Sequence, residues 1–350
     1  RDRSVSRGLG DVYKRQSMAS AGSTLFDSSV KSELIKSWEV GADLRFFNNR
    51  FGIDAAWYKT NATNQLLNIP MDAFSGYESR KVNAGNIQNQ GFELSLNGAI
   101  MQTASGFNWD AQAHFSLNRS KILELTEGVT VYDIKTVDVL QIAATEGGKY
   151  GDIYGQKFVR HNGQVVVGED GLPLITTDKE LIGNQNPDWM LGLTNNFSYK
   201  GFDLNLFFEG MFGNDVNSDW KKESDIWLFT NPAWKNHATR MLGGWSPDNP
   251  NSDIPAISNN TANQEQRFSS WFIEDGSYIK LRNIELGYTF PTKLIKKMHM
   301  SNLRLYAAAY NVFTLKKFWG DDKYTSFDPE RPSYHYLTPF TFNFGINVSF

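Results

Sequence analysis

The residue pair most suggestive of catalysis is His114 and Ser116, which lie two positions apart. A histidine that removes the proton of a serine hydroxyl is one way in which a hydrolase generates a nucleophile. Residues two apart also share one face of a β-strand, so any strand with a polar face carries such pairs without a catalytic role. No oxyanion donors can be identified beside the pair. The sequence therefore predicts no enzyme activity.

Metal, cofactor and nucleotide chemistry also lack a motif. The five histidines are isolated, and none has the His-Glu-x-x-His spacing of a zinc site. The absence of cysteine excludes disulfides and thiolate ligands. Acidic clusters at 248–253, 321–322 and 328–330 do not have the ligand spacing of an EF-hand. We expect these clusters to be solvated turns, and we expect no metal or cofactor site.

Tryptophans are the best candidates for ligand contact. Indole faces stack on sugar rings and also anchor protein interfaces. The stretch 214–277 carries five of them, namely Trp220, Trp227, Trp234, Trp245 and Trp271. They could contact cargo or a partner protein, or they could form the core of their own loop or lie at the lipid headgroups. For Trp38, Trp57 and Tyr199, at the ends of expected strands, the headgroup position is favoured.

Composition narrows the class of protein that could present these side chains. The chain has 350 residues, a net charge of -3 and 14% aromatic residues, and its mean hydropathy is -0.44. No window has the roughly 18 apolar residues that a membrane-spanning helix needs. A transmembrane β-barrel also averages polar, because only alternate residues face lipid. Lysine and arginine are scattered, so no nucleic-acid partner is expected.

Alternation of apolar and polar residues recurs along the chain. In 340–350, Phe342, Phe344 and Ile346 alternate with small or polar residues, and the stretch ends at Phe350. Successive strand residues point to opposite faces, so each such segment presents one apolar and one polar face. Nine segments are expected to be strands, at 37–47, 51–59, 92–100, 107–118, 189–199, 202–213, 278–290, 303–313 and 340–350.

Connections between the expected strands alternate in length. Short ones lie at 48–50, 102–106, 200–201 and 291–302, the last with a short helical pattern. Long ones lie at 60–90, 119–188, 214–277 and 314–339. Outer-membrane barrels have short periplasmic turns and long outer loops, and single-chain bacterial barrels have an even number of strands. We therefore expect lipid contact, a periplasmic C-terminus at which Phe350 assists assembly, and further strands before residue 37.

Several motifs carry a family resemblance. They are NPDWMLGL at 186–193, YKGFDL at 199–204, WSPDNP at 245–250, EDGSYIKLRNIELGY at 274–288, and NVFT at 311–314 with DPE at 328–330. From about residue 37 to the end, the chain resembles the C-terminal barrel of the SusC/RagA family of TonB-linked outer-membrane proteins. The most specific of these motifs is the one at 274–288.

The resemblance implies an all-β fold, an antiparallel transmembrane barrel of about 22 strands, of which this chain supplies about nine or ten. It also implies a plug domain and a TonB-interacting segment, which we expect in a longer protein of which this chain is a part. The implied partners are the TonB complex and a SusD-like surface lipoprotein, the implied cargo is an oligosaccharide or a peptide, and the implied location is the outer membrane of a Gram-negative bacterium.

We assign 17–350 to the C-terminal part of a TonB-dependent receptor barrel. Residues 1–16 are rich in arginine and lack the apolar core of a signal peptide, so we interpret them as a foreign or unstructured segment. Two alternative functions stay open. A passive porin would have only strands upstream, and a soluble carbohydrate-binding β-protein would fold without detergent.

Overall fold

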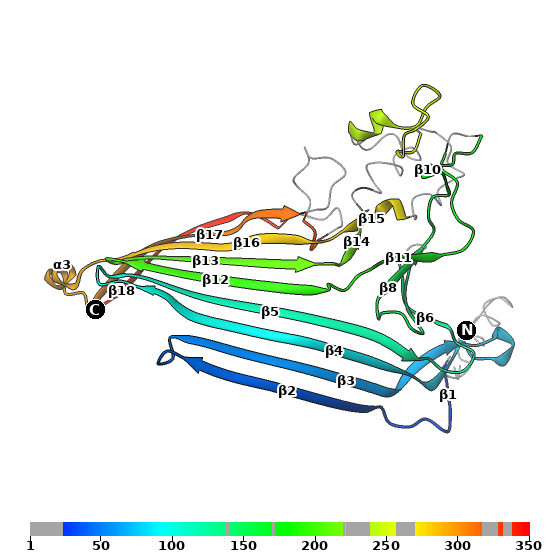
Figure 1. Ribbon diagram of the computed structural model, residues 1–350, viewed down its shortest axis with the longest axis horizontal. Coiled ribbons are helices and arrows are strands. Elements are labelled where there is room, and N and C mark those ends of the chain that lie inside the picture. The colour runs from blue at the N-terminus through cyan, green and yellow to red at the C-terminus, as the bar shows by residue number, and fades with distance from the viewer. Residues whose placement is uncertain are drawn as a thin grey trace, which may run out of the picture.

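A single curved sheet of long antiparallel strands forms the body of the molecule, with smaller groups of strands beyond one end (Figure 1). The computed structural model describes residues 24–137, 140–169, 172–219, 221, 239–256, 270–316, 328–331 and 338–350. None of the helices in these ranges has the length and apolarity needed to cross a membrane.

Nine long strands form the sheet in the order of the sequence, so that each of the nine pairs with the one before it. They are β2 (Leu34–Phe46), β3 (Phe51–Pro70), β4 (Ser79–Gln102), β5 (Phe107–Glu124), β12 (Trp189–Tyr199), β13 (Phe202–Phe212), β16 (Tyr278–Thr289), β17 (Asn302–Lys316) and β18 (Thr341–Ser349). A short strand, β1 (Thr24–Phe26), pairs in parallel with β4. The prediction of nine strands in an antiparallel sheet is confirmed. Within the described residues the sheet does not close, and β2 and β18 are its two edges.

The four connections predicted to be short, at 48–50, 102–106, 200–201 and 291–302, all lie at one end of the strands (Figure 1). At the β2–β3 turn, Asn48 and Asn49 have φ values of 55° and 66°, a left-handed conformation that asparagine tolerates better than most residues. At the β12–β13 turn, Gly201 has φ 91°, and a Cβ there would lie 2.7 Å from the Thr289 carbonyl oxygen. The predicted helical turn before β17 is also present, as α3 (Thr292–Ile295) and η6 (Lys296–Met298). We call this the turn end and the opposite one the loop end.

The prediction that 60–90 is a connection was wrong. Strands β3 and β4 stay paired from Phe51↔Gly98 to Pro70↔Ser79, and only 71–78, with η1 (Ala73–Ser75), connects them. Polar side chains stabilise the pairing beyond the apolar zone, where the Asn61 amide donates to Asn86 at 3.1 Å. A strand that has left the lipid needs no apolar face, so its sequence no longer alternates.

The stretch 119–188 contains more structure than the few short strands expected. A four-stranded sheet is formed by β6 (Val131–Val137), β7 (Leu140–Thr145), β8 (Asp152–Gly155) and β11 (Glu180–Asn184), and β9 (Arg160–His161) pairs with β10 (Gln164–Val165). Ile122 and Leu125 at the end of β5 pack with Ala144 in a small core. In the next stretch, β14 (Asp215–Asn217) pairs with β15 (Ile273–Asp275), near η3 (Thr239–Gly243) and η5 (Ser270–Phe272).

The register places the apolar residues of the nine strands on one face. One row across the sheet joins, strand by strand, Phe46, Phe51, Gly98, Ala111, Asn195, Leu206, Ile284, Ala309 and Phe342. Side chains on this face are open to the surroundings, with exposed fractions of 70% for Val40, 50% for Leu286 and 78% for Phe344. In a soluble protein such an apolar face packs against another layer. Here the face is uncovered, as on the lipid-facing side of a transmembrane barrel.

Aromatic residues border this apolar face at both ends. At the loop end, Trp189 stacks on Phe212 with ring centroids 3.8 Å apart, and Trp38 and Trp57 lie on the same face. At the turn end, Phe202 packs against Tyr288 at 4.5 Å, beside Tyr199. Eleven residues of β12 separate the two borders, about 25 Å of height for a strand tilted by about 40°. This height matches the hydrocarbon core of an outer-membrane barrel, and Trp38, Trp57 and Tyr199 lie at its edges as predicted.

Candidate functional site

The opposite face of the sheet is polar along its whole width. The central row joins Asp43, Asp54, Ser95, His114, Gly192, Glu209 and Lys280. A neighbouring row includes Asn196, Asn205, Glu285 and Asn343, and the Asn205 amide donates to Asn196 at 2.7 Å. This face has the chemistry of a water-filled lining, and any site for a polar solute lies on it.

His114 has a hydrogen-bond partner other than Ser116. Its Nδ1 lies 2.9 Å from the hydroxyl oxygen of Ser95 on β4, directly across the strand pair. Ser116 shares the face, and no hydrogen bond links its hydroxyl to His114 in the described residues. Both residues lie on the polar face of β5, where an alternating strand places polar residues two positions apart.

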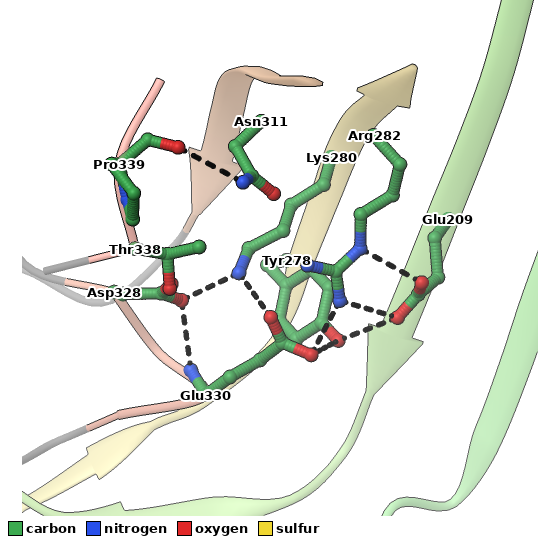
Figure 2. Close-up of polar contacts among 9 residues, drawn as sticks. All are labelled: Glu209, Tyr278, Lys280, Arg282, Asn311, Asp328, Glu330, Thr338 and Pro339. Carbon is green, nitrogen blue, oxygen red and sulfur yellow. Dashed lines mark hydrogen bonds and ion pairs between the residues drawn. The ribbon is translucent and has the colours of Figure 1, made fainter. Parts of the chain in front are cut away.

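A cluster of charged side chains lies on the polar face at the loop end (Figure 2). It comprises Glu209 of β13, Tyr278, Lys280 and Arg282 of β16, and Asp328 and Glu330 of the segment between β17 and β18. We call these six residues the charged cluster. The Lys280 side chain is only 4% exposed and the Tyr278 residue 2%. We call the described residues between β17 and β18, 328–331 and 338–340, the segment before β18, and the charged cluster holds this segment against the wall of the sheet.

Two cations and one phenol connect the two sides of the charged cluster. Lys280 Nζ lies 2.5 Å from Asp328 and also contacts Glu330. Arg282 pairs with Glu209 at 2.9 Å and with Glu330 at 2.5 Å. The Tyr278 hydroxyl oxygen lies 2.9 Å from Glu209 and 3.0 Å from Glu330. Charges this enclosed persist only when paired and hydrogen-bonded, so the two segments depend on each other.

A β-bulge makes this arrangement possible. The register between β13 and β16 shifts between Phe207 and Phe208, which leaves Arg282 as an extra residue on β16. A bulge redirects the side chains beside it. Without the bulge, alternation from Ile284 and Leu286 would put Lys280 and Arg282 on the apolar face. With it, Lys280 lies opposite Glu209 and Leu281 opposite Phe208, so both cations reach the polar face.

The two loop carboxyls of the charged cluster are ionised at neutral pH. Burial raises the pKa of Asp328, but hydrogen bonds from Lys280 and Thr338 outweigh it and hold that pKa below its usual range. Burial likewise raises the pKa of Glu330, and hydrogen bonds from Arg282 and Lys280 hold it below the usual range. A carboxyl with a lowered pKa in the folded state stabilises the fold above its unfolded pKa and loses that effect as pH falls through the folded value.

We therefore expect the segment before β18 to detach in acid. Its hydrogen-exchange protection should be constant between about pH 5 and 8 and should fall below about pH 4, where ordinary carboxyls begin to protonate. In Asp328→Asn/Glu330→Gln the pH dependence should be lost and protection should already be low at pH 7. A segment that stays protected in acid in the wild-type protein contradicts the role of these carboxylates.

The expectation that 328–330 is a solvated turn was wrong. The Asp328 side chain is 11% exposed and the Glu330 side chain 30%, because both satisfy the cations of β16. In the sequence, Lys280 and Arg282 fall in step with the apolar Ile284 and Leu286. Two cations at such positions were the signal that the strand is irregular there and that carboxylates approach it from elsewhere. Residues 321–322 lie outside the described residues. In the part of the chain that the structure describes, no group of three or more histidine, aspartate or glutamate residues is arranged to hold a metal ion.

Two of the five predicted contact tryptophans lie in the described residues. Trp271 packs against a core of Met241 and Phe272, stacks on Phe158 at 5.9 Å, and lies under the Lys221 ammonium at 4.1 Å. In this structure it forms part of the core of its own loop. Trp245 is half-buried, and its backbone N–H donates to the Ile254 carbonyl at 2.8 Å. Trp220, Trp227 and Trp234 lie outside the described residues.

Phe350 ends the chain at the turn end (Figure 1). The residue is 89% exposed, and Ser301 holds the strand end through its N–H, which donates to the Ser349 carbonyl at 2.8 Å. An exposed terminal aromatic beside an edge strand is open to another protein, so its role in assembly stays a prediction.

Comparison with known proteins adds to this geometry. A model of the family described as TonB dependent receptor-like, beta-barrel matches residues 4–312. TonB-dependent receptor P3 of Formosa agariphila is 28% identical over 358 residues, which cover 93% of this chain and 35% of that protein. TonB-dependent receptor SusC of Bacteroides thetaiotaomicron is 26% identical over 375 residues, which cover 98% of this chain and 34% of SusC. The chain thus spans about a third of the length of these curated relatives.

A solved structure agrees on the fold. A structure of the RagAB peptide transporter superposes with a TM-score of 0.72 at 23% identity, covering 91% of this chain and 35% of that one. The curvature and strand order of the sheet are therefore those of part of a large barrel.

Proposed function

The chain belongs to the TonB dependent receptor-like, beta-barrel family, and from this premise we propose that it forms the C-terminal part of the barrel of a SusC-like importer in a Gram-negative outer membrane. The observation that carries the proposal is the division of the nine strands into an apolar face bordered by aromatics and a polar face. Lipid covers the first face and the solute pathway follows the second.

Closure of the barrel needs strands beyond this chain. The edges β2 and β18 present backbone N–H and C=O groups to their surroundings, and an unpaired edge in lipid costs several kcal/mol for each polar group. Strands from the rest of a longer protein pair with these edges. The same longer protein supplies the plug and the segment that contacts the TonB complex, through which the inner membrane provides energy.

Orientation follows from the lengths of the connections. The turn end, which includes the C-terminus at Phe350, faces the periplasm, and the loop end faces outward. The loop end then carries the charged cluster, the small sheets, Trp245 and Trp271, and a SusD-like lipoprotein and an oligosaccharide or peptide cargo arrive there. RagAB is a peptide transporter, which supports a peptide cargo for the whole protein. The resemblance of the sequence motifs to the SusC/RagA family supports the lipoprotein partner and the oligosaccharide.

Uptake measurements test the proposal. Cells that express the full-length protein are given fluorescently labelled oligosaccharides and peptides, in strains with and without functional TonB. We expect TonB-dependent accumulation of at least one cargo and recovery of the protein in the outer-membrane fraction. Uptake that is unchanged without TonB identifies a passive porin, and a protein recovered in the soluble fraction identifies the carbohydrate-binding alternative. Either result overturns the proposal.

A further inference from the structure

A cavity of about 500 Å³ lies on the polar face near the loop end, away from the charged cluster. Its wall is formed by β4, β5, Gln65 of β3 and the start of β12, and its rim by the segments 149–150 and 184–188. The volume falls in the range of sites that hold small molecules. We call this space the β4–β5 pocket.

Side chains of the β4–β5 pocket have hydrogen-bonding capacity left over. Gln65, Asn89 and Ser116 line it and are half-buried, and no hydrogen bond to their side chains occurs in the described residues. Asn118 accepts a bond from the Tyr58 hydroxyl at 3.3 Å through its Oδ1, and among those same residues its amide N–H groups have no acceptor. Each amide can donate and accept at once. The pocket therefore offers mixed donors and acceptors on one wall.

The charged groups of the β4–β5 pocket are two cations that share one carboxylate. Arg119 pairs with Asp188, and Lys149 Nζ lies 3.4 Å from the same carboxylate. All three side chains are about one-third to one-half exposed, so solvent weakens these pairs. Both cations nonetheless contact Asp188, which leaves the neutral amides and hydroxyls as the principal free partners for a ligand.

Tyr150 borders the β4–β5 pocket, and hydrogen bonds anchor its backbone. Tyr150 is 40% exposed, and its backbone is held on both sides. Its N–H donates to the Ser120 hydroxyl at 3.0 Å, and its carbonyl accepts from the Asn186 amide at 2.7 Å. An exposed ring whose backbone is anchored provides contact area with little loss of conformational entropy on binding.

We propose that the β4–β5 pocket binds a neutral sugar unit of the cargo, an inference that rests on the importer proposed above. A sugar ring presents hydroxyls, each of which donates and accepts, and apolar C–H faces. The free groups of Gln65, Asn89, Ser116 and Asn118 match the hydroxyls, and the Tyr150 ring matches a C–H face. Arg119 and Lys149 share Asp188, so one positive charge is left over that a peptide carboxylate could also use. The peptide probe described below tests that alternative.

Calorimetry on the full-length protein in detergent tests the assignment. The probes are maltohexaose, xylohexaose and mannohexaose, with a ten-residue glycine-serine peptide as the comparison. We expect one hexasaccharide to bind, and Gln65→Ala/Asn89→Ala and Tyr150→Ala each to weaken it about tenfold or more, as expected for the loss of two hydrogen bonds or of one stacking contact. Gln112→Ala, on the same face of β5 but outside the pocket, is the matched control and should leave affinity unchanged.

The outcomes separate the pocket from the transporter. If a sugar binds and the pocket variants do not change its affinity, the assignment of the sugar site to the β4–β5 pocket is wrong, and the importer proposal is unaffected. Peptide binding that the pocket variants weaken, without sugar binding, overturns the sugar assignment alone. If no probe binds and TonB-dependent uptake is also absent, the importer itself fails, and the pocket proposal falls with it.

Discussion

Ala113→Arg is expected to destabilise the folded protein in bilayers by about 2–4 kcal/mol, the cost of an arginine at the midplane of an outer-membrane barrel. Ala113 lies midway along β5 on the apolar face, between Leu96 and Leu193 of the neighbouring strands. None of these side chains can pair with a guanidinium. Urea titration of the full-length protein folded into liposomes measures the effect.

The matched control is Gln112→Arg, one residue away on the polar face of the same strand. Gln112 lies between Asn97 and Thr194, where water solvates the new charge, and we expect a change within about 1 kcal/mol. Equal destabilisation by the two arginines contradicts the division of the sheet into a lipid face and a water face.

Lys280→Met is expected to detach the segment before β18 and to cost about 3–5 kcal/mol, as when a buried ion pair loses one partner. The methionine leaves the buried Asp328 carboxylate without the ammonium that hydrogen-bonds to it, while Glu330 keeps Arg282. Hydrogen exchange should show faster exchange at 328–331 and 338–340, and the thermal midpoint should fall.

Two further variants make this second prediction specific. Lys157→Met removes a lysine whose pair with Glu180 is largely exposed, so we expect a change of at most about 1 kcal/mol. In Lys280→Met/Asp328→Asn the uncompensated charge is also removed, and much of the lost stability should return. A segment as well protected in Lys280→Met as in the wild-type protein shows that the charged cluster does not hold it.

Local alternation was enough to predict most of the sheet. In β5, Trp109, Ala111 and Phe115 alternate with polar residues, and the structure places them on one face as a regular strand requires. The same reasoning failed for the outer halves of β3 and β4, because strands that extend beyond lipid do not need apolar residues at every second position. There the polar pairing of Asn61 with Asn86 replaces the alternation.

The site was less accessible to sequence reasoning, because its parts are distant along the chain. Lys280 and Asp328 are 48 residues apart, and nothing local to Asp328 distinguishes it from a solvated turn. The β4–β5 pocket likewise joins β4 and β5 with residues beyond 180. Trp271 was recognised as a residue with two possible roles, and only the fold shows that Phe158 and Met241 surround it. Its part in cargo contact stays a prediction.

The most direct test of the central claim is a spin-label scan along β5. The chain has no cysteine, so single cysteines at 111–116 can be labelled one at a time in the full-length protein, freed of any cysteine elsewhere and reconstituted in liposomes. We predict that labels at 111, 113 and 115 collide with dissolved oxygen, and that labels at 112, 114 and 116 collide with a water-soluble nickel chelate. Labels at the odd positions that are shielded from both reagents contradict the account, because that result places the apolar face against protein instead of lipid.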